Sequence, residues 1–72
     1  MTIYEVEKEL KRIIYALELK LSEKYVNLRG VAESTRIPYQ LVWRFKMGYV
    51  KKPNLDHIKR LCKHFNIAVG EL

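Results

Sequence analysis

The sequence has little of what several common classes of protein require. It contains one cysteine, two prolines and three glycines in 72 residues. A single cysteine, Cys62, can form neither an internal disulfide nor a cysteine-based zinc site. The longest strongly apolar run is residues 13–17, far shorter than the ~20 residues of a membrane-spanning helix. The N-terminal residues are rich in glutamate and lack the pattern of a signal peptide, so we expect neither secretion nor membrane insertion.

Residues that could support catalysis or bind a metal are also sparse. His57 and His64 lie on one predicted helix, about 10 Å apart along its axis, which is too far to share a metal ion. The serines and threonines have no evident base and orienting partner, and the glycines are too dispersed to form a phosphate-binding loop. We therefore expect no enzymatic activity, no metal, no cofactor and no small-molecule ligand, with Cys62 as a buried, inert thiol.

What the chain does contain is enough apolar residues for one small core. Hydrophobic residues make up 49% of the sequence and charged residues 31%, which is typical of a folded domain and not of a disordered chain. Its length allows one domain, spanning residues 1–72. A core of this size contributes about 3–5 kcal/mol of net stability, so a partner or a dimer would help.

The positive charge of the chain is concentrated in its second half. Lysine and arginine number 14 against 8 acidic residues, for a net charge of +6. Residues 1–34 sum to zero, so residues 35–72 carry the entire excess. Aromatic residues are interleaved with the basic ones between positions 36 and 52, where there is no acidic residue. A one-sided positive surface attracts a polyanion, most often nucleic acid, although charge alone leaves open a solvated basic face without a ligand.

Hydrophobic periodicity predicts an all-α domain that begins with a long helix. Apolar residues recur at helical spacing over residues 3–21 and build one stripe, with Thr2 and Glu5 placed as a capping box. Asn27 is a good N-cap for a short helix over residues 28–35.

Two further helices follow, each opened by a proline or an asparagine. Pro38 suits the first position of a helix over residues 38–47, which ends at Gly48. Pro53-Asn54 opens a helix over residues 54–65. Residues 68–72 either begin a short fifth helix or form an extended tail.

The two short central helices, separated by a few residues, suggest a helix-turn-helix. Residues 27–48 resemble the helix-turn-helix of the Cro and phage-repressor (XRE-type) family. Ala32 matches the small residue where the two helices cross, and Ile37, Val42 and Phe45 match buried positions. The resemblance covers residues 24–72 and implies a compact, lambda-repressor-like domain of four to five helices.

The turn departs from the family pattern at one position. Arg36 stands where the family usually has glycine, and arginine tolerates a left-handed backbone less well than glycine or asparagine. Either Arg36 accepts modest strain, or the turn differs slightly.

The outer face of the helix over residues 38–47 carries the chemistry of base recognition. A helical wheel places Leu41, Val42 and Phe45 on one side, with polar and aromatic side chains opposite. Arginine donates two hydrogen bonds to guanine, and glutamine pairs in the same way with adenine. The resemblance implies that the base-reading residues are Tyr39, Gln40 and Arg44, flanked by Trp43.

Contacts to DNA phosphates are expected on both sides of this helix. The start of the helix over residues 28–35 presents free backbone amides, and the family places a clamp on the DNA backbone at the far end of the reading helix. The predicted phosphate-contacting residues are Asn27, Arg36, Lys46, Tyr49, Lys51 and Lys52.

These observations predict a sequence-specific, double-stranded DNA-binding regulator of transcription. The resemblance implies repression, and it implies a homodimer on half-sites one helical turn apart. We expect the protein in the cytoplasm of a prokaryote or of a phage-infected host. Candidate dimer surfaces are residues 67–72 and a face of the first helix formed by Tyr4, Tyr15 and Leu19.

Two other functions fit parts of the pattern. The face of Tyr39, Trp43 and Met47 could anchor an acidic partner protein, which would make the chain a protein-interaction module. Charge alone could instead give a non-specific, architectural nucleic-acid binder.

Overall fold

The protein is folded into a small bundle of helices. The computed structural model describes residues 3–69, which form four α-helices and no strand: α1 (Ile3–Leu21), α2 (Leu28–Thr35), α3 (Tyr39–Met47) and α4 (Leu55–Phe65). The all-α fold predicted from the sequence is confirmed. No helix within this range combines the length and the apolar character needed to cross a membrane.

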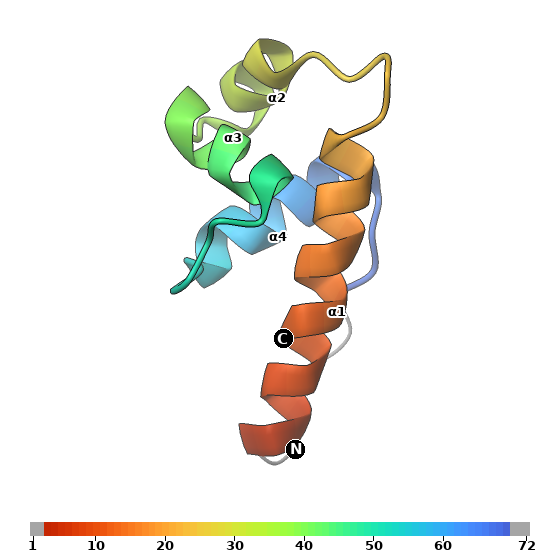
Figure 1. Ribbon diagram of the computed structural model, residues 1–72, viewed down its shortest axis with the longest axis vertical. Coiled ribbons are helices and arrows are strands. Elements are labelled where there is room, and N and C mark those ends of the chain that lie inside the picture. Colours follow the sequence, from red (N-terminus) through yellow and green to blue (C-terminus); the bar gives the residue numbers. More distant parts are fainter. Residues whose placement is uncertain (1–2, 70–72) are drawn as a thin grey trace.

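Helix α1 is the long axis of the molecule. Figure 1 shows its second half packed against α3 and α4, whereas its first half extends well beyond the other helices. Its apolar stripe provides three fully buried side chains, Ile13, Leu17 and Leu21. No glycine or proline interrupts the helix. Because the stripe follows the helical repeat, one face of α1 enters the core while the opposite face stays in water.

The core is apolar and is shared by every helix. Buried side chains from α2, α3, α4 and the turn before α3 form one cluster with the α1 stripe: Val31, Ile37, Val42, Phe45, Ile58, Leu61 and Cys62. Burial in these apolar surroundings raises the pKa of the Cys62 thiol. This thiol is thus buried and free, and it packs as a small apolar side chain.

Two helices begin with asparagine caps. The Asn27 Oδ1 accepts hydrogen bonds from the backbone amides of Arg29 (3.0 Å) and Gly30 (3.4 Å) at the start of α2. The Asn54 Oδ1 accepts from the amides of Asp56 (2.8 Å) and His57 (3.4 Å) at the start of α4. The cap predicted at Asn27 is confirmed, and α4 begins one residue after Asn54 because that residue is itself the cap.

Pro38 differs by one position from the sequence-based prediction. It is the N-cap of α3, with φ −54° and ψ 138°, and not its first helical residue. Proline's fixed φ suits both positions, whereas the extended ψ here places Pro38 before the helix. No side chain caps α3, although the Pro38 carbonyl accepts hydrogen bonds from the amides of Leu41 and Val42.

The turn between α2 and α3 keeps left-handed geometry at Arg36. This residue has φ 58° and ψ 36° and forms the C-cap of α2. The Ala32 carbonyl accepts hydrogen bonds from the amides of both Arg36 and Ile37, so the chain turns sharply and Ile37 enters the core. Of the two alternatives for this position, the structure therefore shows the strained residue and not an altered turn.

Two of the sequence-based predictions concern residues near the ends of the chain. Thr2 of the predicted capping box and residues 70–72 of the possible fifth element lie outside the described range. Residues 67–69 are not helical, and the guanidinium of Arg12, which pairs with Glu9, also donates to the Ala68 carbonyl at 3.4 Å. The segment after α4 is thereby held beside α1, as Figure 1 shows.

Candidate nucleic-acid interface

Helix α3 has one buried face and one exposed face. Val42 and Phe45 are buried in the core, whereas Tyr39 and Trp43 keep 45% and 41% of their surface exposed. Gln40 and Arg44 are also exposed. These four residues, predicted from the sequence to read bases, line one open groove of about 420 Å³. The structure thus brings the whole predicted base-reading set together on the outer face of a single helix.

Aromatic contacts hold the two ends of this face in position. The Trp43 ring meets Tyr49 in the loop after α3 edge to face, with 5.7 Å between ring centroids and 64° between planes. At the other end, the Arg29 guanidinium from α2 lies 5.8 Å from the centre of the Tyr39 ring. Such contacts favour one arrangement of the rings before any ligand binds, which reduces the conformational entropy lost on binding.

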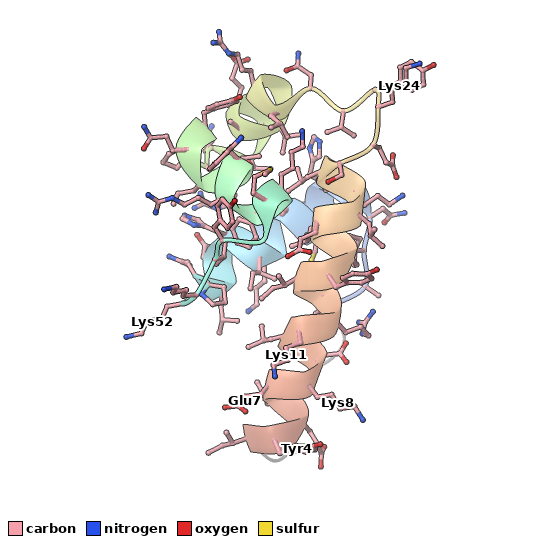
Figure 2. All side chains as sticks on the ribbon, in the orientation of Figure 1. Tyr4, Glu7, Lys8, Lys11, Lys24 and Lys52 are labelled. Atoms are coloured by element: carbon pink, nitrogen blue, oxygen red, sulfur yellow. The ribbon has the colours of Figure 1, made fainter. Side chains whose placement is uncertain are left out.

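A second groove adjoins the first and has a mainly apolar lining, to which cationic and polar side chains are added. It lies between α3, the loop over residues 48–54 and the start of α4, and has a volume of about 490 Å³. Arg44 lines both grooves and therefore joins them. The predicted phosphate-contacting residues Tyr49, Lys51 and Lys52 line this second groove and are exposed. Figure 2 shows Lys52 projecting into solvent on the side of the molecule away from α1.

The remaining predicted phosphate contacts lie in different surroundings. Lys46 is half-buried on the last turn of α3. Asn27 is exposed, but its Oδ1 is engaged in capping α2. An approaching phosphate would therefore meet the side-chain NH₂ of Asn27 as a donor there, whereas the amides of Arg29 and Gly30 already donate to Oδ1.

Arg36 lies apart from the other predicted residues. It lines a separate groove of about 520 Å³ between the end of α2 and α4, together with Arg60, Lys63 and His64. This groove shares no residue with the two grooves beside α3. Within it, Arg60 Nη2 lies 2.9 Å from the Asp56 carboxylate, which offsets part of the positive charge.

Three residues of this region are not among those predicted from the sequence. Arg29 is placed beside Tyr39 by the crossing of α2 and α3, while Asn54 and His57 line the groove with Arg44 and Lys51. A sequence signal exists for the last two, because the first turn of α4 directly follows the basic loop. Arg29 has no such signal, since its contact depends on tertiary packing.

The comparisons with known proteins agree with this geometry. A profile of the Cro/C1-type HTH DNA-binding domain family matches residues 16–72, a span that begins within α1 and includes α2, α3 and α4. No curated protein and no solved structure matched the chain. The resemblance found in the sequence is therefore confirmed at the level of the family.

Proposed function

Because the chain belongs to the Cro/C1-type helix-turn-helix DNA-binding domain family, we propose that it is a sequence-specific transcriptional regulator that reads the DNA major groove with α3. The observation that carries this proposal is the shared groove of Tyr39, Gln40, Trp43 and Arg44 on the exposed face of α3. The major groove, about 12 Å wide, admits one α-helix together with its side chains.

Each of the four side chains has a role that suits its chemistry. Arg44 donates to the O6 and N7 atoms of guanine, and Gln40 forms the equivalent pair of hydrogen bonds with adenine. Tyr39 and Trp43 contact thymine methyl groups or sugars at the two ends of the face. The packing of Trp43 against Tyr49 and of Arg29 against Tyr39 supports these end positions.

Contacts to the DNA backbone would flank the bases. Asn27 and the first turn of α2 are proposed to meet one phosphate, and Lys46, Tyr49, Lys51 and Lys52 to meet the strand near the loop after α3. Arg36 is expected to contribute least, because its groove is separate from those beside α3. With about five phosphate contacts per protomer, the logarithm of affinity should fall with the logarithm of salt concentration with a slope of about −4 to −5.

Membership of the Cro/C1-type family supports a proposal for the biological role. We propose that the protein binds as a homodimer to two half-sites and represses transcription by occupying the site that polymerase needs. It would act on DNA in the cytoplasm of a prokaryotic or phage-infected cell. Occupation of a site suffices for repression, so no catalytic group is required.

A fluorescence-anisotropy titration tests the proposal. The protein is titrated into a labelled pool of random duplex DNA at low and moderate salt, and the preferred site is then selected from that pool. Micromolar binding that weakens steeply with salt is expected for the random pool. An absence of binding at low salt would contradict the proposal and favour a protein-interaction module.

A pair of variants then separates specific from architectural binding. Arg44→Ala should cost about 1–3 kcal/mol on the selected site while affecting random DNA little. Lys51→Ala, which removes one cation of the loop, should weaken both duplexes by similar factors. If Arg44→Ala produces the same small loss on both duplexes, binding is driven by charge alone.

A further inference from the structure

Helix α1 carries apolar side chains that its own chain leaves in water, both on the part that extends beyond the other helices and where the packed half begins. Ile3, Tyr4 and Tyr15 expose between 61% and 80% of their surface. Successive residues of an α-helix are rotated by about 100°, so these three side chains share a sector about 120° wide with Glu7, Lys11 and Ile14. We refer to these six residues as the arm face. Figure 2 shows three of them, Tyr4, Glu7 and Lys11, on the extended part of the helix.

The arm face has a regular internal order. Glu7 and Lys11 occupy its centre, Ile3 and Ile14 lie along one edge, and Tyr4 and Tyr15 lie along the other. Within residues 3–69, neither Glu7 nor Lys11 forms an ion pair with another side chain, although three other pairs are present in that range. The centre of the face therefore holds one unpaired charge of each sign.

This order is complementary to itself. When two copies of α1 run antiparallel about a two-fold axis near residue 9, Glu7 of each copy lies opposite Lys11 of the other. The same register places Ile3 opposite Ile14 and Tyr4 opposite Tyr15, because a two-fold axis perpendicular to the helices brings like edges together. All three pairings follow from one register, and each occurs twice.

A groove beside the arm face offers room for the incoming copy. It has a volume of about 360 Å³ and lies between α1 and the loop after α3, lined by apolar groups of Leu10, Ile14, Val50 and Pro53. Glu7, Lys11 and Tyr15 also line it. In the antiparallel register, Ile3 of the partner protomer reaches Ile14 at the edge of this groove and is thereby withdrawn from water.

The same register sets the spacing of the two recognition helices. An ideal Cβ on Gly48, at the end of α3, would lie 2.8 Å from Glu18 Oε1, so α3 ends beside Glu18. Glu18 is nine residues from the axis, which at 1.5 Å per residue places the two α3 ends about 27 Å apart along α1. From this end, each α3 extends away from the two-fold axis (Figure 1). The midpoints of the two α3 helices are therefore farther apart than their ends, and their separation approaches the ~34 Å of one DNA turn.

We infer that the chain forms a symmetric homodimer through the arm face of α1, with Glu7 of each protomer paired to Lys11 of its partner. This inference deepens the proposed function, since it supplies the two-fold arrangement that two half-sites require. It selects the helix 1 candidate of the two dimer surfaces considered from the sequence and redefines its edges, because Leu19 falls outside the arm face.

Sedimentation of the free protein over micromolar to millimolar concentrations tests the inference in the absence of DNA. The wild type should pass from monomer to dimer in this range. Glu7→Lys and Lys11→Glu should each weaken association roughly tenfold, because each creates two like-charge contacts across the axis. The double variant carrying both substitutions should recover most of the wild-type association, since it restores both pairs with reversed polarity.

Matched controls separate pairing from folding. Lys20→Glu makes the same charge change on the opposite side of α1 and should leave association unchanged. Tyr4→Ser should weaken dimerisation, whereas Tyr25→Ser, which alters another exposed tyrosine, should not. Far-UV circular dichroism verifies that each variant keeps its helical content.

The outcomes distinguish the interface from the DNA-binding function. A monomer at every concentration, or a double variant that associates no better than the single ones, overturns the arm-face dimer. Binding of each variant to random duplex DNA is measured separately by anisotropy. A dimer that follows the charge pattern without binding DNA would overturn the proposed function and leave the interface standing. DNA binding by a protein that stays monomeric at every concentration would overturn the interface and leave the DNA-binding function standing.

Discussion

The left-handed backbone at Arg36 should lower the stability of the native protein, and its relief can be measured. A residue with a Cβ in this conformation is disfavoured by about 1–2 kcal/mol, because the Cβ approaches the following carbonyl oxygen. Arg36→Gly removes the Cβ but adds about 0.5–1 kcal/mol of backbone entropy to the unfolded chain. The expected net gain in free energy of unfolding is about 0.5–1 kcal/mol, or a rise of roughly 2–8 °C in Tm for a domain of this size.

Thermal and urea denaturation followed by circular dichroism give this value directly. Arg36→Ala is the matched control, because it removes the same guanidinium while keeping the Cβ and hence the strain. Only Arg36→Gly should be more stable than the wild type. Equal stability of the glycine and alanine variants would refute the strain argument and assign the effect to charge repulsion among Arg36, Arg60 and Lys63 in their shared groove.

Three further predictions concern stability and are checked by the same denaturation assays, and a fourth concerns its dependence on pH. Gly30→Ala should raise the free energy of unfolding by about 0.5–1 kcal/mol, because the added Cβ meets only the Asn27 side chain, at an ordinary 3.8 Å. Gly48→Ala should lower it by about 1–2 kcal/mol, because φ there is +73°; a neutral result would mean that the turn relaxes. Leu17→Ala should cost about 2–5 kcal/mol, since Leu17 is fully buried, and a loss below 1 kcal/mol would show that the core collapses around the cavity. Cys62 should make the free energy of unfolding fall in alkali, because burial raises the pKa of its thiol in the native protein. The stabilising contribution of the neutral thiol is fully present below the unfolded pKa near 9.0 and is lost as pH rises through the native pKa. Cys62→Ala should therefore lessen the fall of stability with pH.

Features that depend on local sequence could be predicted with good accuracy. The stripe of α1 follows from the spacing of apolar residues, and the cap at Asn27 follows from its own side chain reaching the amides of the next turn. The predicted start of α3 is wrong by one residue, because the fixed φ of Pro38 is compatible with both the cap and the first turn. Only ψ distinguishes the two positions, and the sequence does not determine it there.

Features that depend on tertiary packing could not be predicted in the same way. The helical repeat alone gathers Tyr39, Gln40, Trp43 and Arg44 on one face, and these four residues do line one groove in the folded protein. The approach of Arg29 to Tyr39, in contrast, requires the crossing of α2 and α3, which no local pattern encodes. Proximity in sequence likewise groups Arg36 with the residues of α3, whereas the sharp turn directs it into a different groove.

The position of Trp43 gives this protein a built-in optical probe. It is the only tryptophan in the chain, and it lies half-exposed on the outer face of α3 beside Tyr49, not in the core. Its emission should therefore change little when the core loosens but strongly when a base or sugar displaces water from the indole. Unlabelled wild-type protein can thus report its own occupancy of DNA by intrinsic fluorescence, in the same sample in which circular dichroism follows the helices.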